Sequence, residues 1–474
     1  MSGRIKSLGL VLVGAIAGIL VSLNFQAIGQ LATRSPLPVE ELRSFTEVFG
    51  AIKQNYVEPV EDRKLITEAI NGMLAGLDPH SAYLDAESYK ELQVGTQGKF
   101  GGLGIEVSME DGLVKVISPI EDTPAYRAGV KPGDLIIKLD DAQVKGMTLN
   151  DAVKRMRGKP NTQITLTLVR KGEPQPIVVT LTRAEIQVQS VKSKVVEPGY
   201  AWVRISQFQE KSADDLARHV TNLFKQGPVK GLVLDLRNDP GGLLYGAVAI
   251  SAAFLPSKAL VVSTDGRTED ARKKFYATNE DYLRSLKDDM MKSLPAAVKT
   301  VPMVVLVNGG SASASEIVAG ALQDHKRATV IGTQTFGKGS VQTIMQLGNN
   351  TAIKLTTARY YTPSGRSIQA KGITPDVIVE EPGAAQARIR EADLQRHLGN
   401  GQDKDAEKQA ARAKPAAGSP AAPATPAEPF KPIELGSKDD FQLQQAIAFL
   451  KGEPVKGQPP AIAQTRPAAA PKSN

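Results

Sequence analysis

The chain has 474 residues, of which 41% are hydrophobic, and its 58 Lys and Arg against 50 Asp and Glu give a formal net charge of +8. This length and apolar content predict two or three domains, each with its own core. The basic residues are scattered along the chain, which disfavours nucleic-acid binding. No cysteine is present, which excludes disulfide bonds and thiol chemistry and leaves the compartment open.

Residues 1–32 are predicted to be an export segment. Arg4 and Lys6 precede an uncharged apolar run over residues 8–23, the pattern of a secretory signal peptide. Ala27 and Gly29 offer a small-residue cleavage site, and an uncleaved membrane anchor is the alternative, because residues 24–32 lengthen the stretch. Since the positive end stays in the cytoplasm, we expect the rest of the chain in the bacterial periplasm or on the periplasmic face of the inner membrane.

Residues 33–95 are predicted to form an N-terminal helical region. A helix over residues 42–56 follows from the helical spacing of Phe45, Val48, Phe49 and Ile52. A second helix over residues 65–77 ends at the string Asp78-Pro-His-Ser-Ala-Tyr-Leu84. His80 lies in this string, and a turn stiffened by Pro79 explains it better than a catalytic role does.

Residues 96–184 contain two glycine-bearing strings, Gly98-Lys-Phe-Gly-Gly-Leu-Gly-Ile-Glu-Val107 and Ala128-Gly-Val-Lys-Pro-Gly-Asp-Leu-Ile136. Together they resemble a PDZ domain, which is β-rich, with residues 150–156 as the helix beside its groove. The resemblance implies that backbone N–H groups of one loop bind the terminal carboxylate of a peptide, which adds as a strand to the sheet edge. The implied loop residues are Gly102, Leu103, Gly104 and Ile105.

Residues 185–382 are predicted to form an α/β core. A strand over residues 199–208, an amphipathic helix over 213–224 and a buried strand over 231–236 follow one another, which favours parallel strand pairing. The second strand ends at the turn Arg237-Asn-Asp-Pro-Gly-Gly242. A glycine turn at the carboxyl end of a parallel strand suits a binding crevice, and a tight connection to a helix would use the same glycines.

A second strand–turn–helix unit holds the candidate nucleophile, Ser313. An apolar strand over residues 301–308 leads into Gly309-Gly-Ser-Ala-Ser-Ala-Ser-Glu316, and the apolar spacing that follows predicts a helix to about residue 325. At such a turn, backbone N–H groups and the helix dipole face an oxyanion. The structural alternative is that Ser313 and Glu316 only form a capping box.

Lys338 is the candidate general base. It follows a strand over residues 329–332 in the string Thr335-Phe-Gly-Lys-Gly-Ser-Val-Gln342, where Gln342 is spaced to hydrogen-bond it. A serine needs a base to take its proton, and a buried lysine serves when low dielectric lowers its pKa by roughly 3 units. Among the four histidines, His325 lies roughly 18 Å along the helix from Ser313, which disfavours a Ser-His-Asp triad without excluding it.

These serine and lysine strings closely resemble those of the carboxyl-terminal processing proteases, also called tail-specific proteases, and the likeness covers roughly residues 40–380. The resemblance implies a multidomain α/β protein with a crotonase/ClpP-like protease core, an inserted PDZ domain and N-terminal helices. It implies that Ser313 is the nucleophile, Lys338 the general base and Gln342 the residue that orients the lysine. It also implies an oxyanion hole made by the N–H groups of Ala314 and of Gly241 or Gly242.

The expected activity is that of an exported serine endopeptidase that cuts protein substrates near their C-termini, with the PDZ domain binding the substrate C-terminus and gating activity. No metal, nucleotide or other cofactor is implied. The expected partners are proteins or peptides with free C-termini, while an adaptor protein, membrane contact and a homo-oligomer stay open.

Three other functions are alternatives to this one. A non-catalytic PDZ scaffold that binds protein C-termini is the main alternative, and a histidine-dependent hydrolase is the second. Residues 332–339 also match a phosphate-loop pattern, but Gly339 stands where Mg²⁺ needs Ser or Thr, which disfavours nucleotide hydrolysis.

The remaining residues are predicted to follow the core as a linker, a helix and a tail. Residues 383–434 are the linker, Ala/Pro-rich over 410–432. Residues 435–452 contain an amphipathic helix over 441–450, and residues 453–474 form a disordered tail.

Overall fold

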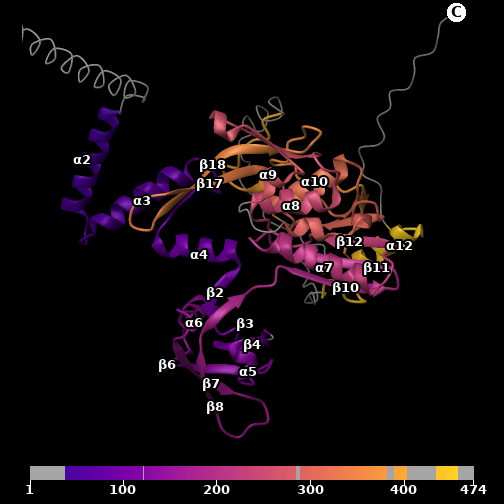
Figure 1. The fold of residues 1–474 in the computed structure, drawn as a ribbon. Helices are drawn as coiled ribbons and strands as arrows, with labels where there is room; N and C mark the ends of the chain where they lie inside the picture. The colour runs from indigo at the N-terminus through magenta and orange to yellow at the C-terminus, as the bar shows by residue number, and fades with distance from the viewer. Residues whose placement is uncertain (1–37, 121, 284–288, 382–388, 403–433, 457–474) are drawn as a thin grey trace, which may run out of the picture. The chain divides into compact units, whose positions relative to one another are not determined.

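The computed structural model describes residues 38–120, 122–283, 289–381, 389–402 and 434–456 (Figure 1). The predicted export segment, the Ala/Pro-rich linker and nearly all of the predicted tail lie outside these residues. A search of the described helices finds none with the length and apolarity needed to cross a bilayer. The chain divides into two compact units, residues 1–72 and 73–474, and each is described by itself.

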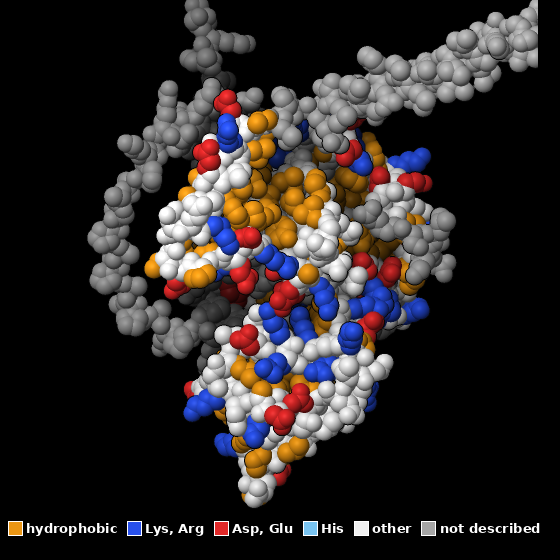
Figure 2. Space-filling view, turned by 90° about the vertical axis from the view of Figure 1, so that its left-hand side faces the viewer, with side chains coloured by type: hydrophobic (Ala, Val, Ile, Leu, Met, Phe, Trp, Pro, Cys, Tyr) orange, Lys and Arg blue, Asp and Glu red, His pale blue; other side chains and the backbone are white. Residues whose placement is uncertain are grey.

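The first unit contains α2 (Val39–Asn55) and most of α3 (Asp62–Ala75). The two predicted helices are therefore confirmed, although both begin earlier than their apolar faces, because Glu40, Glu41 and Asp62 favour the positive ends of the helix dipoles. No residue of α2 is buried. Its exposed hydrophobic side chains are Val39, Leu42, Phe45, Val48 and Ile52. Figure 2 shows hydrophobic side chains gathered in the upper part of one face of the molecule.

A β-rich region follows, and its two ends meet where β2 (Lys99–Gly102) pairs with β9 (Ala184–Gln187). Between them lies a six-stranded antiparallel sheet in the order β3-β4-β5-β7-β8, with β6 paired to β5. Its strands are β3 (Ile105–Glu110), β4 (Leu113–Pro119), β5 (Leu135–Leu139), β6 (Ala142–Gln143), β7 (Gln163–Val169) and β8 (Ile177–Thr182). Two helices, α5 (Pro124–Arg127) and α6 (Leu149–Met156), accompany it, and α6 confirms the predicted groove helix. The alternate residues Ile164, Leu166 and Leu168 of β7 face a core of their own.

The second core is built on a six-stranded sheet in the order β10-β11-β12-β15-β16-β19. The strands are β10 (Val191–Glu197), β11 (Tyr200–Ile205), β12 (Gly231–Asp235), β15 (Met303–Val307), β16 (Thr329–Gly332) and β19 (Val377–Ile378). Only β10 is antiparallel to its neighbour, so the expected parallel pairing is confirmed. Because both faces of such a sheet are covered, β12 and β15 consist of nearly continuous apolar residues, all buried.

Helices cover this sheet on both faces. The helices α7 (Ser212–Gln226), α8 (Leu244–Phe254) and α10 (Ala314–Asp324) contribute to one hydrophobic cluster, with Leu232 and Leu234 of β12. The intervening Val233 belongs to a second cluster, which contains the apolar residues of α12 (Phe441–Lys451). The predicted C-terminal helix is therefore confirmed, and α12 packs on the face opposite to α10 (Figure 1).

A second sheet, antiparallel throughout, runs in the order β1-β18-β13-β14, and β17 also pairs with β18. Its strands are β1 (Ala82–Leu84), β13 (Leu260–Gly266), β14 (Lys273–Tyr276), β17 (Ser340–Gln346) and β18 (Ala352–Tyr361). Among the described residues, the remaining helices are α4 (Ala86–Gln97), α9 (Asn279–Tyr282) and the short 3₁₀ turns η1 (Glu269–Ala271), η2 (Met290–Ser293), η3 (Ala296–Lys299) and η4 (Glu391–Asp393). The strands β17 and β18 follow the loop that carries Lys338.

The register of the parallel strands brings three turns to one edge. Asp235 at the end of β12 pairs with Leu306, and Val307 at the end of β15 pairs with Gly332. The carboxyl ends of β12, β15 and β16 therefore lie side by side. The turn with Gly241, the turn with Ser313 and the loop with Lys338 leave from these three ends, so the fold itself assembles the predicted residues.

Candidate active site

Ser313 lies at the N-cap of α10, directly after the turn that ends β15. Its backbone has φ 57° and ψ −113°, a conformation that costs energy for a residue with a side chain. Strained backbone of this kind is maintained only where the surrounding structure holds it, and it clusters at functional sites. Two hydrogen bonds stabilise this conformation: the Ser313 N–H donates to Glu316 Oε2 at 2.8 Å, and the Ile317 N–H donates to the Ser313 carbonyl at 3.0 Å.

The glycine turn after β12 reaches the serine turn directly. A Cβ added to Gly241 would lie 2.6 Å from the Ala312 carbonyl oxygen, 2.7 Å from Ala314 N and 2.8 Å from Ser313 Cβ, so only glycine fits there. The Gly241 N–H donates to Asp239 Oδ1 at 2.8 Å, so a buried carboxyl group already occupies it. Gly242, with φ 148°, is packed against Phe208 instead.

The loop that carries Lys338 is joined to Ser313 through one carboxyl group. Glu316 is fully buried, and its Oε2 accepts the N–H groups of both Ser313 (2.8 Å) and Lys338 (2.9 Å). Its Oε1 accepts the Gly337 N–H at 2.7 Å and the Thr335 hydroxyl at 2.5 Å. Glu316 therefore fixes the backbones of the candidate nucleophile and the candidate base relative to each other. Burial raises the pKa of Glu316 to about 7, although these four donors act against the rise and satisfy its ionised form.

Tyr360 of β18 makes a second connection between the same two residues. Its hydroxyl oxygen lies 3.0 Å from Ser313 Oγ and 2.5 Å from the Lys338 carbonyl oxygen. Because a carbonyl oxygen can only accept, the Tyr360 hydroxyl donates its proton to the Lys338 carbonyl. The Ser313 hydroxyl can then donate its own proton to the Tyr360 oxygen. No pattern in the sequence around Tyr360 distinguishes it from the neighbouring Tyr361.

The electrostatic surroundings of Lys338 favour its neutral form. Burial, followed by the nearby charge of Lys354, lowers the pKa of Lys338 below its ordinary value. Three carboxyl groups, Glu391, Glu316 and Asp78, act in the opposite direction. The net direction is the one that a general-base lysine requires.

Gln342 lies on β17, and its Nε2 donates to Ser340 Oγ at 3.0 Å and to Thr356 Oγ1 at 3.3 Å. Its expected hydrogen bond to Lys338 is not among these contacts and stays a prediction. Thr356 in turn donates to Asp78 Oδ1 at 3.0 Å, which connects Gln342 to the Asp-Pro-His-Ser string.

The four predicted carboxylate-loop residues lie together in the β-rich region. Gly102, Leu103, Gly104 and Ile105 line a groove of about 180 Å³ with residues of α6 and with Phe100 and Val107. Gly104 has φ 77°, and a Cβ there would lie 2.2 Å from the Thr123 side chain, so glycine is required. The Arg157 guanidinium lies 4.6 Å from the centre of the Phe100 ring at the same groove.

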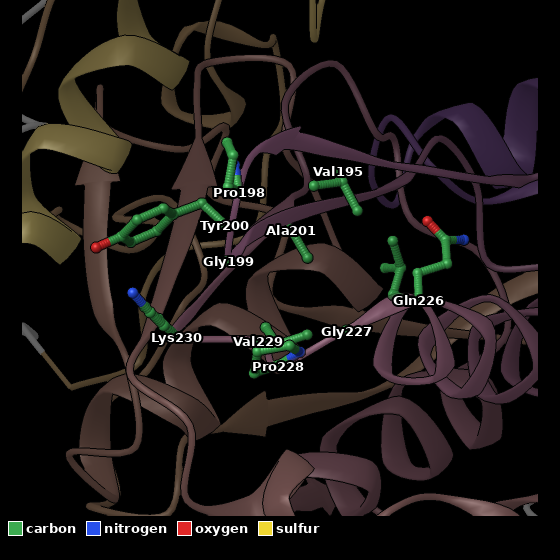
Figure 3. A pocket seen from close by; sticks show the side chains of 11 residues that line it. Val195, Pro198, Gly199, Tyr200, Ala201, Gln226, Gly227, Pro228, Val229 and Lys230 are labelled. Atoms are coloured by element: carbon green, nitrogen blue, oxygen red, sulfur yellow. The ribbon is translucent and has the colours of Figure 1, made fainter.

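A separate pocket of about 310 Å³ contains none of the candidate site residues. Figure 3 shows residues 198–201 on one side of it and residues 226–230 on another. Val195 of β10 and Leu223 of α7 complete its lining, which is largely apolar and contains no Ser, Thr, His, Asp or Glu. Within the described ranges, no group of three or more His, Asp or Glu side chains is placed to hold a metal ion.

Family models match three consecutive parts of the chain. The match for peptidase family S41 covers residues 199–379, that for a PDZ domain covers residues 101–181, and that for the N-terminal domain of the activating protease CtpB covers residues 23–88. The carboxy-terminal-processing protease of Bartonella bacilliformis is 45% identical over 448 residues, which are 92% of this chain and 95% of that protein. This chain belongs to the carboxy-terminal processing proteases of peptidase family S41.

A second curated relative agrees with this family membership. The carboxy-terminal processing protease CtpA of Bacillus subtilis is 34% identical over 398 residues, 83% of this chain and 81% of that protein. Among solved structures, the photosystem II D1 C-terminal processing protease is 31% identical, covers 71% of this chain and 86% of its own, and gives a TM-score of 0.40.

The chain is therefore a serine peptidase with a PDZ domain, and the predicted family, fold class and enzyme class are confirmed. As a processing protease with a PDZ domain, it acts on protein or peptide substrates. The residue roles, the domain boundaries and the compartment stay predictions.

Proposed function

We propose that this protease cuts protein substrates near their C-termini through a serine–lysine mechanism, with Ser313 as nucleophile and Lys338 as general base. The observation that carries the proposal is the single Glu316 oxygen that accepts the backbone N–H groups of both residues. That contact holds the two backbones within a few ångströms of each other. The lowered pKa of Lys338 makes its neutral form available for proton transfer.

In the proposed reaction, Lys338 takes the proton of the Ser313 hydroxyl as Oγ attacks the scissile carbonyl. The hydroxyl must first turn away from Tyr360, its partner in the resting structure. Lys338 then gives the proton to the leaving amine, and water resolves the acyl-enzyme. Gln342 is proposed to orient the lysine during these steps.

The oxyanion hole is proposed to use the Ala314 N–H at the start of α10 and the Gly242 N–H. Gly241 is the less suitable donor because its N–H already bonds to Asp239, while its missing side chain lets the glycine turn approach the Ser313 turn closely. Donors fixed in this way act without reorganisation when charge develops.

The PDZ domain, for which we propose residues 96–184, would bind the free C-terminal carboxylate at Gly102–Ile105 and gate the peptidase core of residues 185–382. Binding of a peptide ending in a free carboxylate should be lost when that end is amidated, as measured by fluorescence anisotropy. Deleting residues 98–183 should alter turnover of an unfolded protein, and unchanged kinetics would contradict the gating.

Export is proposed from residues 1–32, with the enzyme in the periplasm or on the periplasmic face of the inner membrane. A fusion of residues 1–40 to an alkaline phosphatase that is active only outside the cytoplasm should be active. An inactive fusion that is nevertheless produced would contradict export.

The decisive experiment incubates the protein from residue 38 onward with an unfolded protein, alongside Ser313→Ala and Lys338→Ala variants. Loss of cleavage in both variants, with melting temperatures unchanged, supports the mechanism. Loss in Ser313→Ala alone indicates another base, histidine included. If the parent protein binds peptides but cleaves none of the substrates tested, the scaffold alternative is supported.

A further inference from the structure

A segment far along the chain, residues 389–402, hydrogen-bonds to the loop that carries Lys338. This segment lies within the range that the sequence predicts to be a linker. In residues 389–402, the Glu391 N–H donates to the Phe336 carbonyl at 3.0 Å. On the other side of the lysine, the Gly339 N–H donates to Gln369 Oε1 at 2.9 Å, and Gln369 Nε2 donates to Glu391 Oε1 at 2.9 Å. Glu391 therefore reaches the backbone on both sides of Lys338.

The Glu391 side chain is completely buried, and each of its oxygens has one partner. Oε1 accepts from Gln369, and Oε2 lies 2.8 Å from Nε2 of His80, whose side chain is 17% exposed. Burying a carboxyl group is costly unless it is paired and hydrogen-bonded. None of the proposed chemical steps uses Glu391, so its burial beside the base loop calls for another role.

Glu391 and Lys338 also affect each other through charge. Burial acts to raise the pKa of Glu391, but the hydrogen bonds from His80 and Gln369 and the charges of His80 and Lys338 outweigh it and lower the pKa. Reciprocally, Glu391 opposes the lowering of the Lys338 pKa that burial and Lys354 cause. The groups that face Lys338 are therefore Glu391, Glu316 and Asp78 as anions and Lys354 as a cation.

His80 ties this carboxylate to the other side of the site. Its backbone N–H donates to Asp78 Oδ1 at 2.8 Å, which also accepts from the Thr356 hydroxyl. Thr356 Oγ1 accepts from Gln342 at 3.3 Å. The Asp-Pro-His-Ser string therefore contacts the base loop through Glu391 and Gln342 through Thr356, which gives the string a role beyond that of a stiff turn.

We propose that Glu391, held by His80 and Gln369, is a positioning residue for Lys338 that fixes the loop on both sides of the lysine and presents a negative charge to its ammonium group. This inference rests on the proposed serine–lysine mechanism. Glu391 keeps the loop in its reactive geometry, and its charge limits how far the site favours the neutral lysine.

The first test compares Glu391→Gln with Glu391→Ala. The glutamine retains the shape and an oxygen for Gln369, and its amide nitrogen donates to the other tautomer of His80. Because it removes a negative charge that stabilises the ammonium form, the acidic limb of the pH profile of kcat/KM should move to lower pH by at least half a unit. Glu391→Ala, which also empties the space, should lower kcat about tenfold or more with KM unchanged.

Asp393→Asn is the matched control, because Asp393 is exposed and caps the same short turn through the Arg390 N–H at 2.8 Å. It should leave the pH profile unchanged. An unmoved acidic limb in Glu391→Gln, or an equal shift in Asp393→Asn, would overturn the proposal. A rise in KM with kcat unchanged in Glu391→Ala would also overturn the proposal, since it would indicate that Glu391 contacts the substrate.

The second test does not depend on turnover. In protein with ¹³C-labelled lysine, the Lys338 signal is assigned by its loss in Lys338→Arg, and its titration is followed by NMR in the Ser313→Ala background. Glu391→Gln should lower the Lys338 midpoint. If Glu391→Gln lowers the Lys338 midpoint but the Lys338→Ala variant remains active, the serine–lysine mechanism is refuted and the placement of Glu391 is retained. An unchanged midpoint beside an inactive Lys338→Ala would refute the inference alone.

The third test addresses His80. His80→Ala should lower kcat in the same way as Glu391→Ala but to a smaller extent, and the double variant should lose little more than Glu391→Ala alone, because His80 acts through Glu391. His397→Ala is the control, since its ring hydrogen-bonds to the Leu394 carbonyl at 2.9 Å in the same segment. Additive losses, or an equal loss in His397→Ala, would overturn the role of His80.

Discussion

The nucleophile side and the base side of this active site are assembled in different ways. The nucleophile side is local: the turns after two neighbouring strands bind each other directly, with the Ala312 N–H and the Ser315 hydroxyl both donating to the Asp239 carbonyl at 2.9 Å. On the base side, the Lys338 loop depends on Glu316, Tyr360, Gln369 and Glu391, which come from four separate segments. A nucleophile can thus be placed by two adjacent turns, whereas this base needs contacts from across the core.

The nucleophile side is also supported from the C-terminal helix, and breaking this support should have the largest effect. Arg237, which begins the glycine turn, is buried and donates to Asp235 and to Asp440 of the α12 N-cap, with Nη2–Oδ2 distances of 2.6 Å. Asp440→Ala leaves part of this buried charge uncompensated and removes the cap, so we expect a loss of about 3 kcal/mol in the free energy of unfolding. Calorimetry should detect this as a melting temperature several degrees lower for the core transition.

Lys451→Ala is the matched control on the same helix, because its ion pair with Glu197 is partly exposed, with side chains 28% and 45% accessible. Its loss should be below about 1 kcal/mol. Equal destabilisation by the two variants would mean that α12 is held by its apolar face alone, and the buried pair would then add nothing to the nucleophile side.

Glu316→Gln tests the point at which the two sides meet. Glutamine offers only one accepting oxygen, so it cannot serve all four donors of the carboxylate, and the Ser313 and Lys338 backbones should lose their common partner. We expect kcat to fall about 100-fold with little change in KM, measured on a peptide substrate. Glu453→Gln, an exposed change on the C-terminal segment, is the control. A rise in KM with kcat unchanged would show that Glu316 acts on substrate binding instead.

The contrast between the two sides also explains what the sequence could predict. The positions of Ser313 and Gly241 in the site can be predicted from the sequence, because each residue follows a strand with a strong apolar pattern. Parallel strands bring the turns at their carboxyl ends to one edge of the sheet. Lys338 is predicted as the general base by the glycine-rich string around it, which resembles that of known proteases. Tyr360 and Glu391 could not be found, because their roles come from the pairing of β18 and from a segment after β19 whose local sequence resembles a linker.

Tyr360→Phe isolates one contact of the base side. The change removes the hydroxyl between Ser313 Oγ and the Lys338 carbonyl and keeps the ring in place. Losing a buried hydrogen bond costs about 1 kcal/mol, so kcat should fall about tenfold or less. Tyr361→Phe, at the next position of β18, should change kcat by less than about twofold. A rise in kcat in Tyr360→Phe would instead mean that the tyrosine restrains the serine at rest.

The smallest expected effect concerns Asp239 on the nucleophile side, which departs from the good pairing found elsewhere there. Its Oδ1 accepts the Gly241 N–H, but among the described residues its buried Oδ2 has no hydrogen-bond partner. Burial raises the pKa of Asp239 to about 8. The unfolded chain loses this proton near pH 4 while the folded protein retains it, so Asp239 supports stability at low pH and loses that contribution as pH rises to about 8.

Asp239→Asn cannot ionise and keeps an oxygen for Gly241, so its stability relative to the parent should improve steadily between pH 5 and pH 8. The measurement is the difference in melting temperature between variant and parent at each pH. Asp265→Asn, an exposed change on β13, should give a small difference that does not depend on pH. A flat difference for Asp239→Asn as well would mean that the buried carboxyl is ionised throughout, and that the glycine turn holds a charge which the Asp239 environment stabilises.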